Sequence, residues 1–96
     1  MLKASYQEAP PELIIPNVIT PNNDGVNDRF YIRGLELYDT RPIIIINRWG
    51  IIVYFNENYT NDWDGGKLSD GVYFYVLEVW DGDTSFTFNG IITLLR

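Results

Sequence analysis

Short runs of β-branched and aromatic residues alternate with clusters of Gly, Asn, Asp and Pro along almost the whole chain. The clusters recur about every 8 to 12 residues, which is the spacing expected for short strands joined by tight turns. No stretch repeats apolar residues at the three- and four-residue spacing of an amphipathic helix. The pattern therefore predicts an all-β fold, an Ig-like antiparallel β-sandwich of about six or seven strands.

The apolar runs define where these strands are expected. The predicted strands are residues 13–19, 28–33, 42–48, 51–55, 72–80 and 85–95, with a short bridge at 34–39 and a bulge at Asn89-Gly90. The loop at 56–70 is expected to be anchored by Trp63. The predicted core residues are Phe30, Ile32, Ile44, Ile46, Val53, Val76, Phe88, Ile92 and Leu94.

The composition limits the function classes. The 96 residues suffice for one domain, and 46% hydrophobic and 16% aromatic residues supply a core. The chain has no Cys, so no disulfide, and no His, so the commonest general base and transition-metal ligand is absent. The serines have no His to activate them, and the sequence predicts that the protein is not an enzyme.

The net charge of −6 also restricts the partners. An acidic surface repels the phosphates of nucleic acids and anionic lipid headgroups. No apolar run has the roughly 18 residues of a membrane-spanning helix. We therefore expect neither nucleic acid binding nor direct membrane insertion, whereas an acidic surface can still attract divalent cations.

The N-terminal segment differs from the rest of the chain. Residues 1–12 are polar, contain Pro10-Pro11 and lack the apolar region of a signal peptide. We therefore expect residues 1–12 to be a linker from a longer parent protein and residues 13–96 to be the domain itself.

The segment 20–28 gathers two Asp, three Asn, a Pro and a Gly. The oxygens of Asn22, Asp24 and Asp28 have a spacing similar to the first part of a calcium loop, although Arg33 stands where an EF-hand has Glu. These three residues form a candidate calcium site. In the alternative interpretation, the Asx side chains bond the loop's own backbone.

Three aromatic motifs are further candidates for binding. Arg48-Trp49 is either a protein-recognition corner or a cation–π brace within its turn. Trp63 in its loop is either a core anchor or a platform for sugar stacking. Separately, Tyr73, Tyr75 and Trp80 of the strand at 72–80 are either core or an aromatic face for carbohydrate. A carbohydrate-binding module is therefore the alternative function.

Taken together and in order, six motifs resemble a known family, the C-terminal domain of gliding-motility-associated and other surface proteins of Bacteroidetes. These motifs are Thr20 to Asp28, Asn47-Arg48-Trp49-Gly50, Val53-Tyr54, Trp63-Asp64-Gly65, Asp70 to Tyr75 and Gly90 to Arg96. That domain is the type B sorting signal of the type IX secretion system.

The resemblance implies a secretion and cell-surface attachment signal for a larger cargo. It implies a route through the periplasm and across the outer membrane, with the secretion machinery and an outer-membrane barrel-type protein as partners. The expected recognition residues are Arg48, Trp49 and Arg96. Arg96 ends the last strand and offers a guanidinium to a partner carboxylate.

Overall fold

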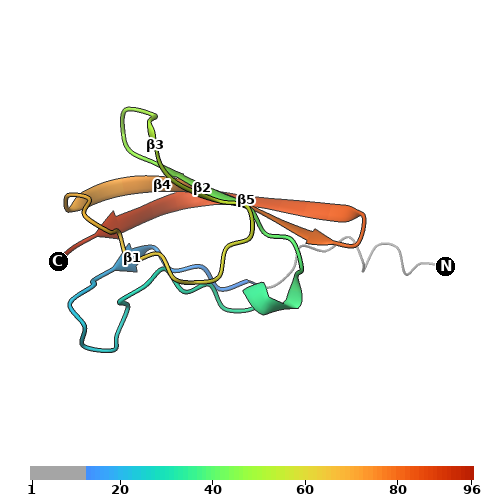
Figure 1. Cartoon of the computed structure of the whole chain (residues 1–96), viewed down its shortest axis with the longest axis horizontal. Coiled ribbons are helices and arrows are strands. Elements are labelled where there is room, and N and C mark those ends of the chain that lie inside the picture. The colour runs from blue at the N-terminus through green and yellow to red at the C-terminus, as the bar shows by residue number, and fades with distance from the viewer. Residues whose placement is uncertain (1–12) are drawn as a thin grey trace.

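The computed structural model describes residues 13–96, and the predicted linker at residues 1–12 lies outside this part. The described residues form one five-stranded sheet with the spatial order β1-β5-β4-β2-β3 (Figure 1). The elements are β1 (Val18–Ile19), the 3-10 turn η1 (Leu35–Leu37), β2 (Ile43–Ile46), β3 (Ile52–Asn56), β4 (Gly71–Asp81) and β5 (Thr84–Leu94). β1 runs parallel to β5 and all other pairs are antiparallel, so the sheet is mixed. The all-β prediction is confirmed, but the described residues contain five strands in one sheet instead of six or seven in two.

The hairpin of β4 and β5 is the longest regular unit of the sheet. Its register is unbroken over 11 residues on each strand, so the predicted bulge at Asn89-Gly90 is wrong. Gly90 instead leaves space for the ring of Tyr75 on the paired strand, because a Cβ added at Gly90 would lie only 3.1 Å from that ring. The register shift occurs on the other side of the sheet, where β2 pairs with β3 between Ile45 and Ile46.

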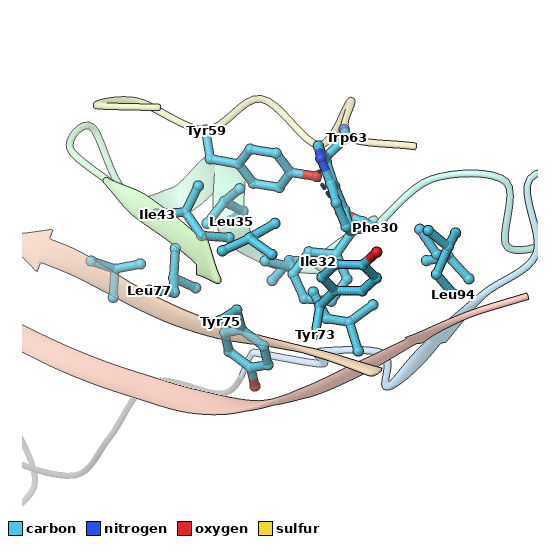
Figure 2. Packing of buried hydrophobic residues seen from close by; sticks show 14 of the residues in the cluster. Phe30, Ile32, Leu35, Ile43, Tyr59, Trp63, Tyr73, Tyr75, Leu77 and Leu94 are labelled. Atoms are coloured by element: carbon cyan, nitrogen blue, oxygen red, sulfur yellow. Dashed lines mark hydrogen bonds between the residues drawn. The ribbon is translucent and has the colours of Figure 1, made fainter. Parts of the chain in front are cut away.

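A layer of irregular chain covers one face of the sheet. Residues 13–17, 20–39 and 57–70 run below the strands in Figure 1, and the core lies between the two layers. The buried core residues are Ile19, Phe30, Ile32, Leu35, Tyr38, Ile43, Ile45, Tyr59, Trp63, Tyr73, Tyr75, Leu77, Val79, Ile92 and Leu94. Figure 2 shows rings from both layers meeting, for example Phe30 and Tyr75 with centroids 5.3 Å apart.

The core prediction is correct near both ends of the chain and wrong in β2 and β4. Phe30, Ile32, Ile92 and Leu94 are buried, and Val53 and Phe88 pack against the core from its edge. Ile44, Ile46 and Val76 point to the opposite face, while Ile43, Ile45 and Leu77 are fully buried. Side chains alternate between the faces of a strand. Both alternating sets are apolar in these two strands, so periodicity gave no basis for choosing between the faces.

The predicted strand at 28–33 does not form, because side chains of the 56–70 loop take the place of a neighbouring strand. Tyr59 Oη donates to the Phe30 carbonyl at 2.8 Å and accepts the Trp63 N–H at 3.0 Å. The Asn61 amide accepts the Ile32 N–H at 2.8 Å and donates to the Ile32 carbonyl at 3.2 Å. The backbone of this segment is therefore satisfied without a ladder.

The predicted strand at 13–19 is reduced to β1 and a single bridge between Ile14 and Arg33. Pro16 lies between the bridge and β1, and proline cannot donate to a ladder. Within residues 13–96, no helix has the length and apolarity needed to cross a membrane.

Candidate functional site

The polar loops and the end of the chain gather at one end of the sheet, on the left in Figure 1. β2 and β5 both run antiparallel to β4, so both strands finish where β4 begins. The turn at 47–51 and Arg96 therefore lie near the loop that leads into β4. The sheet thus brings together the predicted recognition residues Arg48, Trp49 and Arg96, which are far apart in sequence.

The loop at 20–28 is built around the carboxylate of Asp28. One oxygen of Asp28 accepts the N–H groups of Asn22 at 3.2 Å and Asn23 at 3.0 Å, and the other accepts the Gly25 N–H at 2.8 Å. The side-chain oxygen of Asn22 accepts the Asp24 N–H at 3.2 Å. The bond from Gly25, together with those from the neighbouring N–H groups, lowers the pKa of Asp28 below its ordinary value.

These bonds support the interpretation in which the Asx loop satisfies its own backbone. Both oxygens of Asp28 already accept N–H groups, and Asp24 accepts the Val26 N–H at 2.9 Å. Asp64 lines the same open hollow as Asp28. In the described part of the chain, however, no three His, Cys, Asp or Glu side chains come together as a set of metal ligands.

The turn between β2 and β3 presents Arg48 and Trp49 to solvent. The side chain of Asn47 holds the turn by accepting the N–H groups of Trp49 at 2.9 Å and Ile51 at 3.0 Å. The Arg48 guanidinium carbon lies 4.6 Å from the centre of the Trp49 ring. This is the geometry of the predicted cation–π brace. Because Trp49 is still 71% exposed, the stacked pair also offers a flat surface to a partner.

Arg96 fastens the end of the chain to the loop before β4. Its guanidinium donates to the carbonyls of Gly66 and Leu68, and one of its nitrogens lies 3.8 Å from the Asp70 carboxylate. The Arg96 backbone N–H also donates to Asp70 at 3.1 Å. Three points of the loop are thus fixed by one residue, so Arg96 shapes the loop.

A groove joins the turn to this loop. It has a volume of about 380 Å³, and its lining includes Arg48 and Trp49 on one side and residues 67–71 on the other. Leu68 lines the groove and is also one of the residues whose carbonyl Arg96 binds. Arg96 therefore contacts a residue of the groove wall without lining the groove itself.

The rings considered for carbohydrate stacking are mostly core residues. Trp63 is buried, with its ring centroid 6.1 Å from that of Tyr54 and 6.3 Å from that of Tyr73. Tyr75 is buried as well. The anchoring role predicted for Trp63 is confirmed, and neither Trp63 nor the rings of Tyr73 and Tyr75 present an exposed stacking surface.

The sequence interpretation missed two residues of this region, Tyr59 and Asn61. Tyr59 is fully buried, and burial raises the pKa of its hydroxyl well above the ordinary value. Asn61 has a positive φ of 64°, which is typical of a residue that turns the chain. The position of Tyr59 four residues before the anchoring Trp63 was the one sequence feature that pointed to it. Nothing in the sequence indicated that the Tyr59 hydroxyl would bond the Phe30 carbonyl and the Trp63 N–H.

Comparison with known proteins agrees with the resemblance of the motifs. The family CHU_C, described as a type IX secretion signal domain, matches residues 13–94. The chain belongs to this family. It is therefore a C-terminal sorting signal that directs a cargo protein to secretion or the cell surface and interacts with the type IX secretion machinery. Neither the search of curated proteins nor the search of solved structures gave a match.

Proposed function

We propose that this signal domain is recognised at the groove between the Arg48-Trp49 turn and residues 67–71. We propose that the partner that recognises this groove is an outer-membrane barrel-type protein of the type IX machinery. The cargo first reaches the periplasm and there binds this partner protein through its signal domain. This binding leads to export of the cargo across the outer membrane. The observation that carries the proposal is the convergence of Arg48, Trp49 and the loop held by Arg96 at one end of the sheet.

The chemistry of the groove fits a protein partner. Trp and Arg are among the residue types most enriched at binding hot spots, and here they form a stacked pair. Arg96 contributes as a positioning residue, since its guanidinium already bonds to the loop. Removing it would loosen the groove wall without removing the exposed pair.

We also infer that the irregular layer is a reduced second sheet of the Ig-like sandwich. The antiparallel bridge between Ile14 and Arg33 supports this inference, because it pairs two segments of that layer as neighbouring strands would pair. We propose no catalytic activity, because the chain has no His and its three serines lack an activating base.

Export of a reporter tests the proposal. The domain is fused behind a periplasm-targeted reporter in a host with the matching type IX machinery, and surface delivery is measured. We expect Trp49→Ala to reduce delivery about tenfold or more, as for a hot-spot residue. Arg96→Ala should reduce delivery less, since it acts through the loop.

The matched control is Tyr31→Ala, which removes an aromatic ring that is 60% exposed outside the groove. It should leave delivery unchanged. Thermal unfolding of each purified domain separates a folding defect from a recognition defect. Normal delivery by a folded Trp49→Ala variant would contradict recognition at the groove.

A further inference from the structure

The face of the sheet that points away from the core carries a continuous apolar surface. It consists of Ile44, Ile46, Ile52, Phe55, Val72, Phe74, Val76 and Ile91, which we call the outer apolar face. The pairing register orders seven of these residues in two rows across the strands. One row runs through Ile52, Ile46, Phe74 and Ile91, and the other through Phe55, Ile44 and Val76.

This surface is accessible and large for a domain of this size. The exposed fractions are 59% for Ile52, 55% for Phe55 and 46% for Ile91. The eight side chains together expose on the order of 600 Å² of mostly apolar area, at the upper end of the largest patch of a typical monomer. In the part of the chain that the structure describes, no segment covers it (Figure 1).

The outer apolar face is also poor in charge, although the chain carries a net charge of −6. Among the strand residues that point to this side, Glu78 is the one charged side chain, and it is half-buried at the border of the face. The border along β5 is formed by Thr87, Asn89 and Thr93. An apolar centre with a polar rim is the anatomy of a protein interface.

We propose that two copies of this domain associate through their outer apolar faces, sheet against sheet. A standard interface buries about 800 Å² per partner, which the apolar surface and its polar rim together supply. Packed sheets lie about 10 Å apart, so the Ile and Phe side chains of the two copies can interdigitate. A two-fold axis makes the interface isologous, with the same surface used on both copies.

The same two-fold arrangement keeps the acidic groups apart. If the axis passes near Phe74 and Val76 and reverses the direction of β4, Glu78 of one copy lies over the Val72 end of the other. Six residues of strand separate these positions, which corresponds to roughly 20 Å. The net charges of the two copies still repel each other at longer range, and salt screens this repulsion.

Sedimentation equilibrium of the purified 96-residue chain tests the proposal. The expected result is a species with twice the 11.2 kDa mass of the chain, with an association that strengthens as NaCl is added. Phe74→Lys should raise the dissociation constant at least about tenfold, because it places a charge in the buried centre. Leu37→Lys is the matched control, since Leu37 is 75% exposed on η1, outside the outer apolar face. It should leave the dissociation constant unchanged.

Two results would overturn the proposal. The first is a monomer at concentrations up to about 1 mM, because a specific interface of standard size binds more tightly than that. The second is a dimer that persists in both Phe74→Lys and Ile91→Lys, each shown to be folded by circular dichroism. Ile91→Lys provides the test at a separate strand if Phe74→Lys does not fold. The measurement needs no secretion machinery, so its outcome is independent of the export experiment.

Discussion

Val76 and Leu77 are neighbours on β4 and point to opposite faces of the same sheet. Val76 is 44% exposed, whereas Leu77 is fully buried. Both faces of β2 and β4 carry apolar side chains, yet the irregular layer covers one face alone. Which face of these strands is buried therefore depends on where the loops cross the sheet and not on the composition of the strands.

The layer that covers the inner face is held by polar bonds as well as by packing. Tyr59 and Asn61 bond the backbone of residues 30–32, and Asp28 closes the loop beside them. The outer apolar face has no corresponding set of bonds within residues 13–96.

The largest effect on stability should come from truncating Leu77, and its neighbour Val76 provides the comparison on the opposite face. Leu77→Ala should lower the free energy of unfolding by about 2–5 kcal/mol, because it leaves a cavity in the core. Val76→Ala should change it by about 0.5 kcal/mol, as for a surface position. Urea unfolding at low protein concentration measures both. Equal losses would mean that the outer face is covered in the single domain too.

A smaller effect is expected from the hydroxyl of Tyr59. Tyr59→Phe should cost about 1–3 kcal/mol, because it leaves the Phe30 carbonyl and the Trp63 N–H without a partner in the core. Tyr31→Phe, at a residue that is 60% exposed, is the control and should change little. If the two variants are equally stable, the covering layer is held by packing alone.

Acid should weaken the loop at 20–28 through Asp28. The folded-state pKa of this residue lies below the ordinary value of 3.8. Its contribution is therefore complete above that pH and is lost as the pH falls through the lower folded-state pKa. At pH 7 the wild-type domain should have a higher melting temperature than the Asp28→Asn variant, and this difference in melting temperature should shrink in strong acid. A difference that does not depend on pH would contradict a role for the charge.

The smallest effect is expected from calcium. Because the oxygens of Asp28 and Asp24 accept backbone N–H groups, calcium and a chelator should give the same melting temperature. A rise with calcium, lost when Asp24 and Asp28 are both changed to Ala, would restore the candidate site at Asn22, Asp24 and Asp28.

Several elements could be predicted from the sequence because their signals are local. The hairpin around Trp49-Gly50, the long strand after Asp70 and the anchoring Trp63 were all predicted. Turn-forming residues and β-branched runs act over a few residues, so they can be interpreted without knowing the neighbours. The motifs likewise indicated the family before the comparison showed it.

For the proposed groove, the sequence indicated some of the residues but not their arrangement in space. The sequence predicted that Arg48 and Trp49 form either a recognition corner or a cation–π brace, and the structure contains the stacked pair. That Arg96 would bond to the loop before β4 depends on the pairing of β4 with β5. Such a long-range contact leaves no periodic signal in the chain.

The sequence by itself determined that this protein is all-β, where most of its turns lie and which family it belongs to. Tertiary structure decided which of the alternating apolar sets in β2 and β4 is buried, and it replaced the expected strand at 28–33 by bonds to Tyr59 and Asn61. The physical reason is that a strand has two faces with the same period. When both are apolar, only the path of the covering chain distinguishes them.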